Sequence, residues 1–142
     1  MNYSTFEIDY FFIKKDSVLP ELKYPLIQRI REKYNISDEM LDNVAVTFSM
    51  IDADTGIYYI ANAPASLIIN NDRVNSPSEE KYTLSYKFKQ SQTAKTGRYL
   101  GEFVIDFMFY ENSDGCGKLK LPIDRYINII ISDSITQTTV IY

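Results

Sequence analysis

The sequence predicts an all-β fold: a single β-sandwich domain over residues 1–142, with about seven to nine antiparallel strands and one short helical insert. Apolar residues recur with a period of two over most of the chain, the spacing of strands with one buried face. Turn-forming residues separate these runs at roughly ten-residue intervals, which favours a sandwich over a parallel α/β sheet. The 142 residues include 12 Tyr and 8 Phe against 5 Gly and 5 Pro, and a domain of this length buries a core without a disulfide or metal.

In the first half of the chain, alternation predicts four strands, at Phe6–Phe12, Leu22–Ile27, Val44–Met50 and Ile57–Ala61. Between the second and third, Ile27, Ile30 and Tyr34 recur at helical spacing, which predicts a helical insert at about 27–42. The Ser37 hydroxyl is expected to cap a second short turn within the insert. The segment Asp52–Gly56 is typical of a hairpin with Gly at a positive-φ position.

The second half of the chain continues the strand pattern after a polar loop at Asn70–Glu80. The predicted strands are Tyr82–Phe88, Arg98–Tyr110, Lys118–Leu121 and Tyr126–Ser132. Asn112–Gly115 is expected to close a hairpin. The β-prone tail Thr138–Tyr142 is expected to be an edge strand or a strand lent to a neighbouring subunit.

The charge balance excludes several classes of partner. The chain has 15 basic and 19 acidic residues, a net charge of −4, so it has no global attraction to nucleic acid or anionic lipid. Its densest basic stretch, Lys87, Lys89, Lys95 and Arg98, is typical of a solvated strand face and loop. No apolar run approaches the roughly 20 residues of a membrane span, and Met1–Lys15 lacks the pattern of a secretory signal. The missing signal and membrane span, together with the single Cys, predict that the protein is made in a reducing cytoplasm.

No combination of residues predicts catalysis, a cofactor or a metal site. The chain has no His and one Cys, Cys116, so the commonest general base and metal ligand are missing, and a nucleophilic thiolate has no His to form it. Asp52–Gly56 departs from a calcium loop, and Gly115–Lys118 departs from a phosphate-binding loop. Glu102 and Asp106 stand four residues apart on a strand, roughly 13 Å, too far for a glycosidase pair. We therefore expect a protein that is not an enzyme.

The abundant Tyr residues leave two interpretations open. Tyr favours strands, and it is also enriched at protein interfaces because it is large, rigid and half polar. Tyr58 and Tyr59 are neighbours in an alternating run, so one of them must face away from the core. Exposed Tyr supports a protein–protein surface, a well-formed sheet or, more weakly without Trp, a carbohydrate-stacking surface.

Three stretches carry a family resemblance: Ile13–Leu22, Val44–Gly56 and Tyr82–Ile131. The segment Thr93-Ala94-Lys95-Thr96-Gly97-Arg98-Tyr99-Leu100-Gly101-Glu102-Phe103 contributes most of it. Together they resemble the immunoglobulin-like accessory domains of tailed bacteriophage virions, including the N-terminal domain of upper baseplate proteins. Gly97 fits a turn into the long strand and Gly101 a bulge or a bulky neighbour. The insert Ile27–Asp42 and the C-terminal tail depart from the family pattern.

The resemblance implies an immunoglobulin-like sandwich and a structural role in a virion, with synthesis in the host bacterial cytoplasm. We favour an auxiliary capsid protein that decorates or stabilises the head or docks fibres. A tail or baseplate adaptor is the alternative, and a carbohydrate-binding module for host adsorption is the alternative from another class. The expected partners are capsid or tail subunits, with homo-oligomerisation open and no nucleic acid or membrane. The residues expected at the interface are Ile27, Ile30, Tyr34, Tyr58, Tyr59, Thr138, Val140 and Tyr142.

Overall fold

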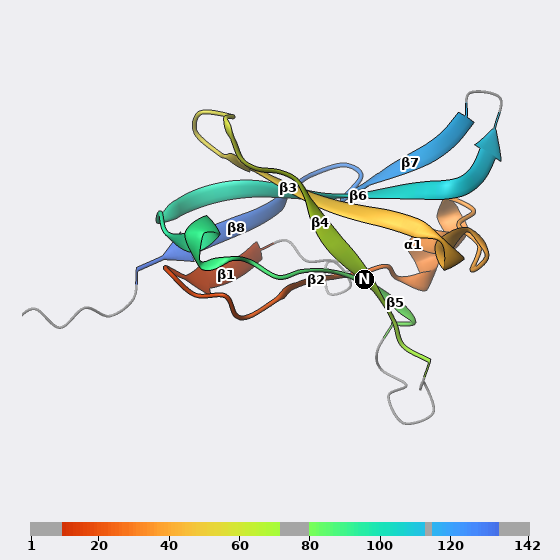
Figure 1. Cartoon of the computed structure of the whole chain (residues 1–142), viewed down its shortest axis with the longest axis horizontal. Helices are drawn as coiled ribbons and strands as arrows, with labels where there is room; N and C mark the ends of the chain where they lie inside the picture. The colour runs from red at the N-terminus through yellow and green to blue at the C-terminus, as the bar shows by residue number, and fades with distance from the viewer. Residues whose placement is uncertain (1–9, 72–79, 113–114, 134–142) are drawn as a thin grey trace, which may run out of the picture.

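The computed structural model describes residues 10–71, 80–112 and 115–133, and β-strands dominate them (Figure 1). The strands of these residues are β1 (Tyr10–Lys14), β2 (Leu22–Pro25), β3 (Val44–Asp52), β4 (Tyr58–Ile69), β5 (Tyr82–Tyr86), β6 (Gly97–Asn112), β7 (Gly115–Leu121) and β8 (Ile127–Ser132). The helical segments are α1 (Gln28–Lys33) and the 3-10 turns η2 (Met40–Asp42) and η3 (Gln90–Thr93). The prediction of an all-β fold with one short helical insert is confirmed.

The strands follow one path, β1-β8-β6-β3-β4-β5-β2, with β7 added to β6. One layer contains β3, β6 and β8, and the other contains β2 and β5. Immunoglobulin-type sandwiches divide their strands in the same way, with the third, sixth and last strands in one sheet and the second and fifth in the other. β4 joins the layers, because its residues up to Ala65 pair with β3 and its residues from Ser66 pair with β5. The oblique course of β4 is visible in Figure 1, and it makes the sandwich a partly closed barrel.

One strand pair corrects the expectation of a wholly antiparallel sheet. β1 runs parallel to β8, with Tyr10 opposite Asn128 and Lys14 opposite Ser132. The other pairs formed by the described strands are antiparallel. Parallel neighbours require a long connection, and these two strands come from opposite ends of the chain. Period-two alternation specifies a buried face but carries no information about strand direction.

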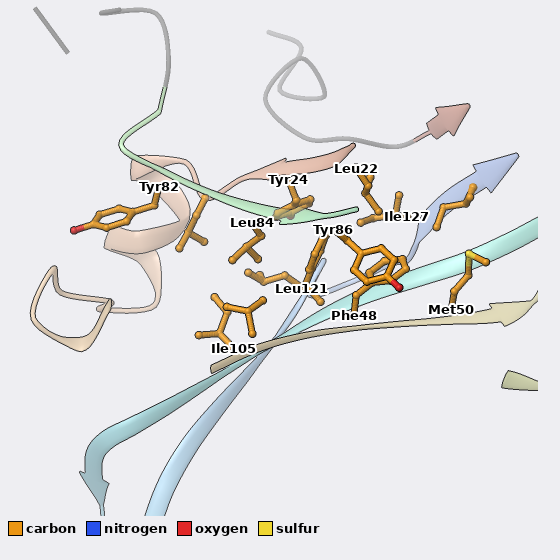
Figure 2. Packing of buried hydrophobic residues seen from close by; sticks show 14 of the residues in the cluster. Leu22, Tyr24, Phe48, Met50, Tyr82, Leu84, Tyr86, Ile105, Leu121 and Ile127 are labelled. Atoms are coloured by element: carbon orange, nitrogen blue, oxygen red, sulfur yellow. The ribbon is translucent and has the colours of Figure 1, made fainter. Parts of the chain in front are cut away.

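The core lies between the two layers and is built from the inward-facing residues of the alternating strands. Tyr99, Phe103, Ile105 and Phe107 of β6 are all buried, as the alternation predicts. From the opposite layer, Leu22, Tyr24, Leu84 and Tyr86 point toward β3 and β6 (Figure 2). Phe48 of β3 is fully buried at the centre of this cluster.

Gly101 allows two bulky side chains to approach β6. A Cβ at this position would lie 2.6 Å from Ile129 Cδ1 and 2.9 Å from Phe48 Cζ. The ring of Phe48 has little room to move, because it stacks on Tyr86 with centroids 4.6 Å apart and lies 5.1 Å from the ring of Phe103. The expectation of a bulky neighbour opposite Gly101 is therefore confirmed.

The predicted turns also form. In the β3–β4 hairpin, Asp52 Oδ1 accepts hydrogen bonds from the amides of Asp54 (2.8 Å) and Thr55 (3.1 Å), and Gly56 has φ +72°. In the helical insert, the Met40 amide donates to the Ser37 hydroxyl at 3.2 Å, the expected cap. Asn112 pairs with Gly115, as expected for the β6–β7 hairpin.

Element boundaries differ from expectation where pairing overrides local sequence. β4 extends eight residues beyond the predicted end at Ala61, through Pro64, because successive parts of it pair with β3 and β5. The sequence did not predict the 3-10 turn η3. Its last residue, Thr93, is completely buried, and the Thr93 hydroxyl donates a hydrogen bond of 2.8 Å to the Ser17 carbonyl. Residues 6–9 of the first predicted strand and the tail Thr138–Tyr142 lie outside the described residues.

Gly101→Ala is expected to lower the free energy of unfolding by about 1–3 kcal/mol, because the added methyl group overpacks the Phe48–Ile129 contact. Glu102→Ala is the matched control on the outward face of the same strand, with an expected change within about 0.5 kcal/mol. Urea denaturation of the two variants checks this. Equal stability of wild type and Gly101→Ala would contradict the packing described for Phe48.

Candidate functional site

The expected interface residues of the helical insert divide into core and surface. Ile27 and Ile30 are buried in the hydrophobic core, so their side chains hold the insert to the sandwich, and Ile30 also contributes to the lining of a groove beside α1. Tyr34 is exposed. It lies at a groove of about 520 Å³ between α1 and the segment after β7, with Lys33 and Ile123 also at its lining.

The two neighbouring tyrosines of β4 face opposite ways, as expected. Tyr58 is 66% exposed, whereas Tyr59 packs against the core with its ring centroid 5.1 Å from that of buried Tyr99. Only Tyr58 of this pair is therefore presented to a partner. Thr138, Val140 and Tyr142 lie outside the described residues.

Apolar side chains, some exposed and some half-buried, lie side by side on the outer face of the sheet. One row of cross-strand neighbours runs Tyr10, Asn128, Leu100, Ile51 and Tyr58, across β1, β8, β6, β3 and β4. Directly paired residues of a sheet project to the same face, so this row forms one surface. Four of its five members are apolar or aromatic.

A second row beside the first contains Phe12 of β1, Ile130 of β8 and the exposed Arg98 of β6. We call the six apolar or aromatic residues of these rows the outer-face patch: Tyr10, Phe12, Ile51, Tyr58, Leu100 and Ile130. The rings of Tyr10 and Phe12 stack with centroids 6.3 Å apart and are 60% and 63% exposed. Three aromatic rings exposed to this degree present roughly 300 Å² together, about the size of the largest apolar patch on an ordinary monomer, which is often functional.

The sequence prediction included Tyr58 and missed the other five residues of the patch. Tyr10 and Phe12 lie in the predicted first strand, and Ile130 lies in the Ile-rich last strand. Alternation with Phe6 and Ile8 predicts Tyr10 and Phe12 on the buried face of the first strand, but this prediction is wrong: both rings are exposed, whereas Phe11 and Ile13 face the core. What the sequence lacks is the strand order that brings these positions together.

The motifs tested for other chemistry keep structural roles. The Asp52 carboxylate caps its own hairpin, and these hydrogen bonds from the Thr55 and Asp54 amides lower its pKa. Glu102 and Asp106 lie half-buried on the outward face of β6. The side chain of Cys116 is not among those described. In the described part of the chain, no three His, Cys, Asp or Glu residues are grouped as metal ligands.

A polar cluster fastens the helical insert to β5. The ring of buried Tyr82 lies near two cations, with the Arg31 guanidinium carbon 5.1 Å and Lys81 Nζ 5.4 Å from its centroid. Asp38 bridges these cations, with Oδ2 3.1 Å from Lys81 Nζ and Oδ1 3.8 Å from Arg31 Nη1. The insert is therefore held by charge and cation–π contacts as well as by Ile27 and Ile30.

Protonation of this cluster is coupled to stability. The hydrogen bond from Lys81 is the main reason that the pKa of the Asp38 carboxyl lies below its ordinary value, with Tyr82 and Arg31 contributing in the same direction. The stabilisation is therefore fully present above the pKa of the unfolded carboxyl, about 3.9. It is lost as the pH falls through the lower pKa of the folded protein.

Asp38→Asn is expected to lower the melting temperature at pH 7, because the neutral amide cannot pair with Lys81 and Arg31. The difference from wild type is expected to shrink as the pH falls from 7 to below the ordinary pKa of the carboxyl, because the wild-type side chain then also becomes neutral. Glu39→Gln removes the same charge from the exposed neighbour and serves as the control. Thermal melts across this pH range check the effect, and a pH-independent difference would contradict it.

The described residues contain no helix long and apolar enough to cross a membrane. Comparisons with protein-family models, with curated proteins and with solved structures find no match for this chain. The feature of the structure that bears most directly on function is the outer-face patch, which combines aromatic and aliphatic side chains from five strands.

Proposed function

We propose that this protein is a non-catalytic structural component of a bacteriophage virion that docks on capsid or tail proteins through its outer-face patch. The observation that carries the docking role is the presence of Tyr10, Phe12 and Tyr58 on one sheet face with most of each side chain exposed. The favoured role is an auxiliary capsid protein, and a tail or baseplate adaptor is the alternative.

The chemistry of the patch suits a protein partner. Aromatic residues are enriched at interface centres, because they cover a large area with few rotatable bonds. Leu100 and Ile51 lie directly opposite each other in the middle of the row, and aromatic side chains stand at both ends of it. Covering such a surface removes apolar area from water at roughly 25 cal/mol per Å², before the costs of association are subtracted.

The virion assignment is supported by the sequence resemblance. The segment Thr93–Phe103 contributes most of it, and in the structure this segment joins η3 to β6. Leu100, which lies within this segment, belongs to the outer-face patch. One residue of the outer-face patch therefore lies in the segment that contributes most of the family likeness.

The first test is cryo-EM of purified virions at side-chain resolution. We expect ordered copies on the head or tail with the outer-face patch against a neighbouring protein. Absence of the protein from the particles would overturn the virion role. Copies whose patch faces solvent would overturn the docking surface while leaving the virion role intact.

A variant pair tests the surface in solution, by cosedimentation of purified protein with virions that lack it. Tyr58→Lys is expected to weaken binding at least tenfold, because it places a charge within the patch. Ile68→Lys is the matched control, since Ile68 is also exposed but lies on the part of β4 that pairs with β5. Equal loss in both variants would contradict docking through the patch.

A second candidate function, carbohydrate binding for host adsorption, is favoured by the stacked rings of Tyr10 and Phe12. Exposed aromatic rings lying on a sheet provide a surface on which sugar rings can stack. This candidate predicts glycan-array binding that Tyr58→Ala weakens while the free energy of unfolding changes by less than about 0.5 kcal/mol. Tyr59→Ala is unsuitable as a probe, because its ring packs on Tyr99. A protein-docking role predicts no glycan binding by wild type.

A further inference from the structure

Arg98 is a cation that lies beside the outer-face patch. It stands on β6, directly opposite Ile130 of β8, so its side chain projects from the same face as that residue. Leu100 of the patch stands two residues further along β6, roughly 7 Å away on the same face. Arg98 itself is exposed. Its charged group is therefore placed next to apolar side chains, on the surface through which we propose that the protein docks.

Arg98 occupies a central position across the sheet. Its strand, β6, is the middle one of the five that run β1-β8-β6-β3-β4. Aromatic side chains stand on the outermost two, with Tyr10 and Phe12 on β1 and Tyr58 on β4. Neighbouring strands are about 4.8 Å apart, so the two ends are separated by roughly 19 Å. A partner that contacts the aromatic rings at both ends passes over the middle strand, where Arg98 and Leu100 lie.

Arg98 forms no ion pair with another of the described residues. The carboxylate of Asp52, opposite Tyr99 on β3, accepts hydrogen bonds from two amides of its own hairpin. Glu102 stands four residues further along β6, roughly 13 Å from Arg98. The Arg98 charge is therefore compensated by water in the free protein.

A partner that covers the patch changes the energetics of this charge. Arg98 can rest its methylene groups on apolar neighbours while its guanidinium stays in water, but a docked protein displaces part of that water. A cation that loses its water without gaining an opposite charge weakens binding. A guanidinium presents a planar set of donors that matches both oxygens of one carboxylate.

We infer that the partner of the outer-face patch presents an Asp or Glu carboxylate to Arg98, beside the apolar area that covers Leu100 and Ile130. The presence of this carboxylate rests on the proposed docking function, to which it adds the chemistry of the partner. Apolar contacts alone leave the orientation of two surfaces open, because hydrophobic attraction is non-directional. A pair joined by two parallel hydrogen bonds fixes that orientation.

Cosedimentation of the purified full chain with virions that lack it tests the carboxylate through variants of Arg98. Arg98→Met replaces the guanidinium with an apolar side chain, so purely apolar docking would keep or strengthen binding. With a carboxylate opposite, Arg98→Met is expected to weaken binding at least tenfold, because that carboxylate is left buried and unpaired. Arg98→Glu is expected to weaken binding further, since it brings like charges together. Arg98→Lys keeps the charge but loses the two-point contact, and its affinity is expected to lie between those of wild type and Arg98→Met.

Lys23→Met and Lys23→Glu are the matched controls, because Lys23 is an exposed cation on β2, in the opposite layer. Both are expected to bind virions as wild type does. Added salt is expected to weaken binding of wild type more than binding of Arg98→Met, because salt screens the attraction between opposite charges. Urea denaturation of each variant checks that the fold is retained.

The outcomes distinguish the carboxylate from docking itself. Loss of binding in Tyr58→Lys, with full binding in Arg98→Met, leaves docking through the patch standing and overturns the carboxylate alone. Equal loss in Lys23→Met and Arg98→Met also overturns it, because a general effect of net charge then explains the result. Wild-type protein that fails to bind, or Tyr58→Lys that binds fully, overturns the docking proposal and the carboxylate with it.

Discussion

The structure depends on one aromatic contact, the packing of Phe48 between the two layers. Phe48 and Phe103 belong to the layer of β3 and β6, whereas Tyr86 and Phe88 come from the β5 side. The ring centroids of Phe103, Tyr86 and Phe88 lie 5.1, 4.6 and 5.9 Å from that of Phe48. The absence of a side chain at Gly101 lets Phe48 and Ile129 approach β6. Interiors packed this densely tolerate little change of volume, so the layers meet in one arrangement and the outward faces follow from it.

The outward face of β3, β6 and β8 carries apolar side chains that do not contribute to the core. Once inward positions such as Phe48 and Phe103 fill the interior, the alternate positions are free to be polar, and Glu102 and Ser49 are. Leu100 and Ile51 on the same face are apolar and pair with each other. Both are half-buried, so the fold leaves part of their apolar surface in contact with solvent.

Tyr10 and Phe12 belong both to this face and to β1, which stands at one end of the strand path. The helical insert lies apart from both. It is fixed by buried Ile27 and Ile30 and by the contacts of Asp38, which makes it part of the scaffold.

The all-β class, the approximate positions of the strands, the Asp52 hairpin and the Ser37 cap could be predicted from local sequence, because alternation and turn chemistry are local properties. The parallel pairing of β1 with β8, the extension of β4 through Pro64 and the burial of Ile27 and Ile30 arise from the three-dimensional fold. So does the outer-face patch, of which the sequence identified only Tyr58. These features depend on which strands become neighbours. The packing of residues far apart in the sequence sets that order, and the alternation within a single strand carries no information about it.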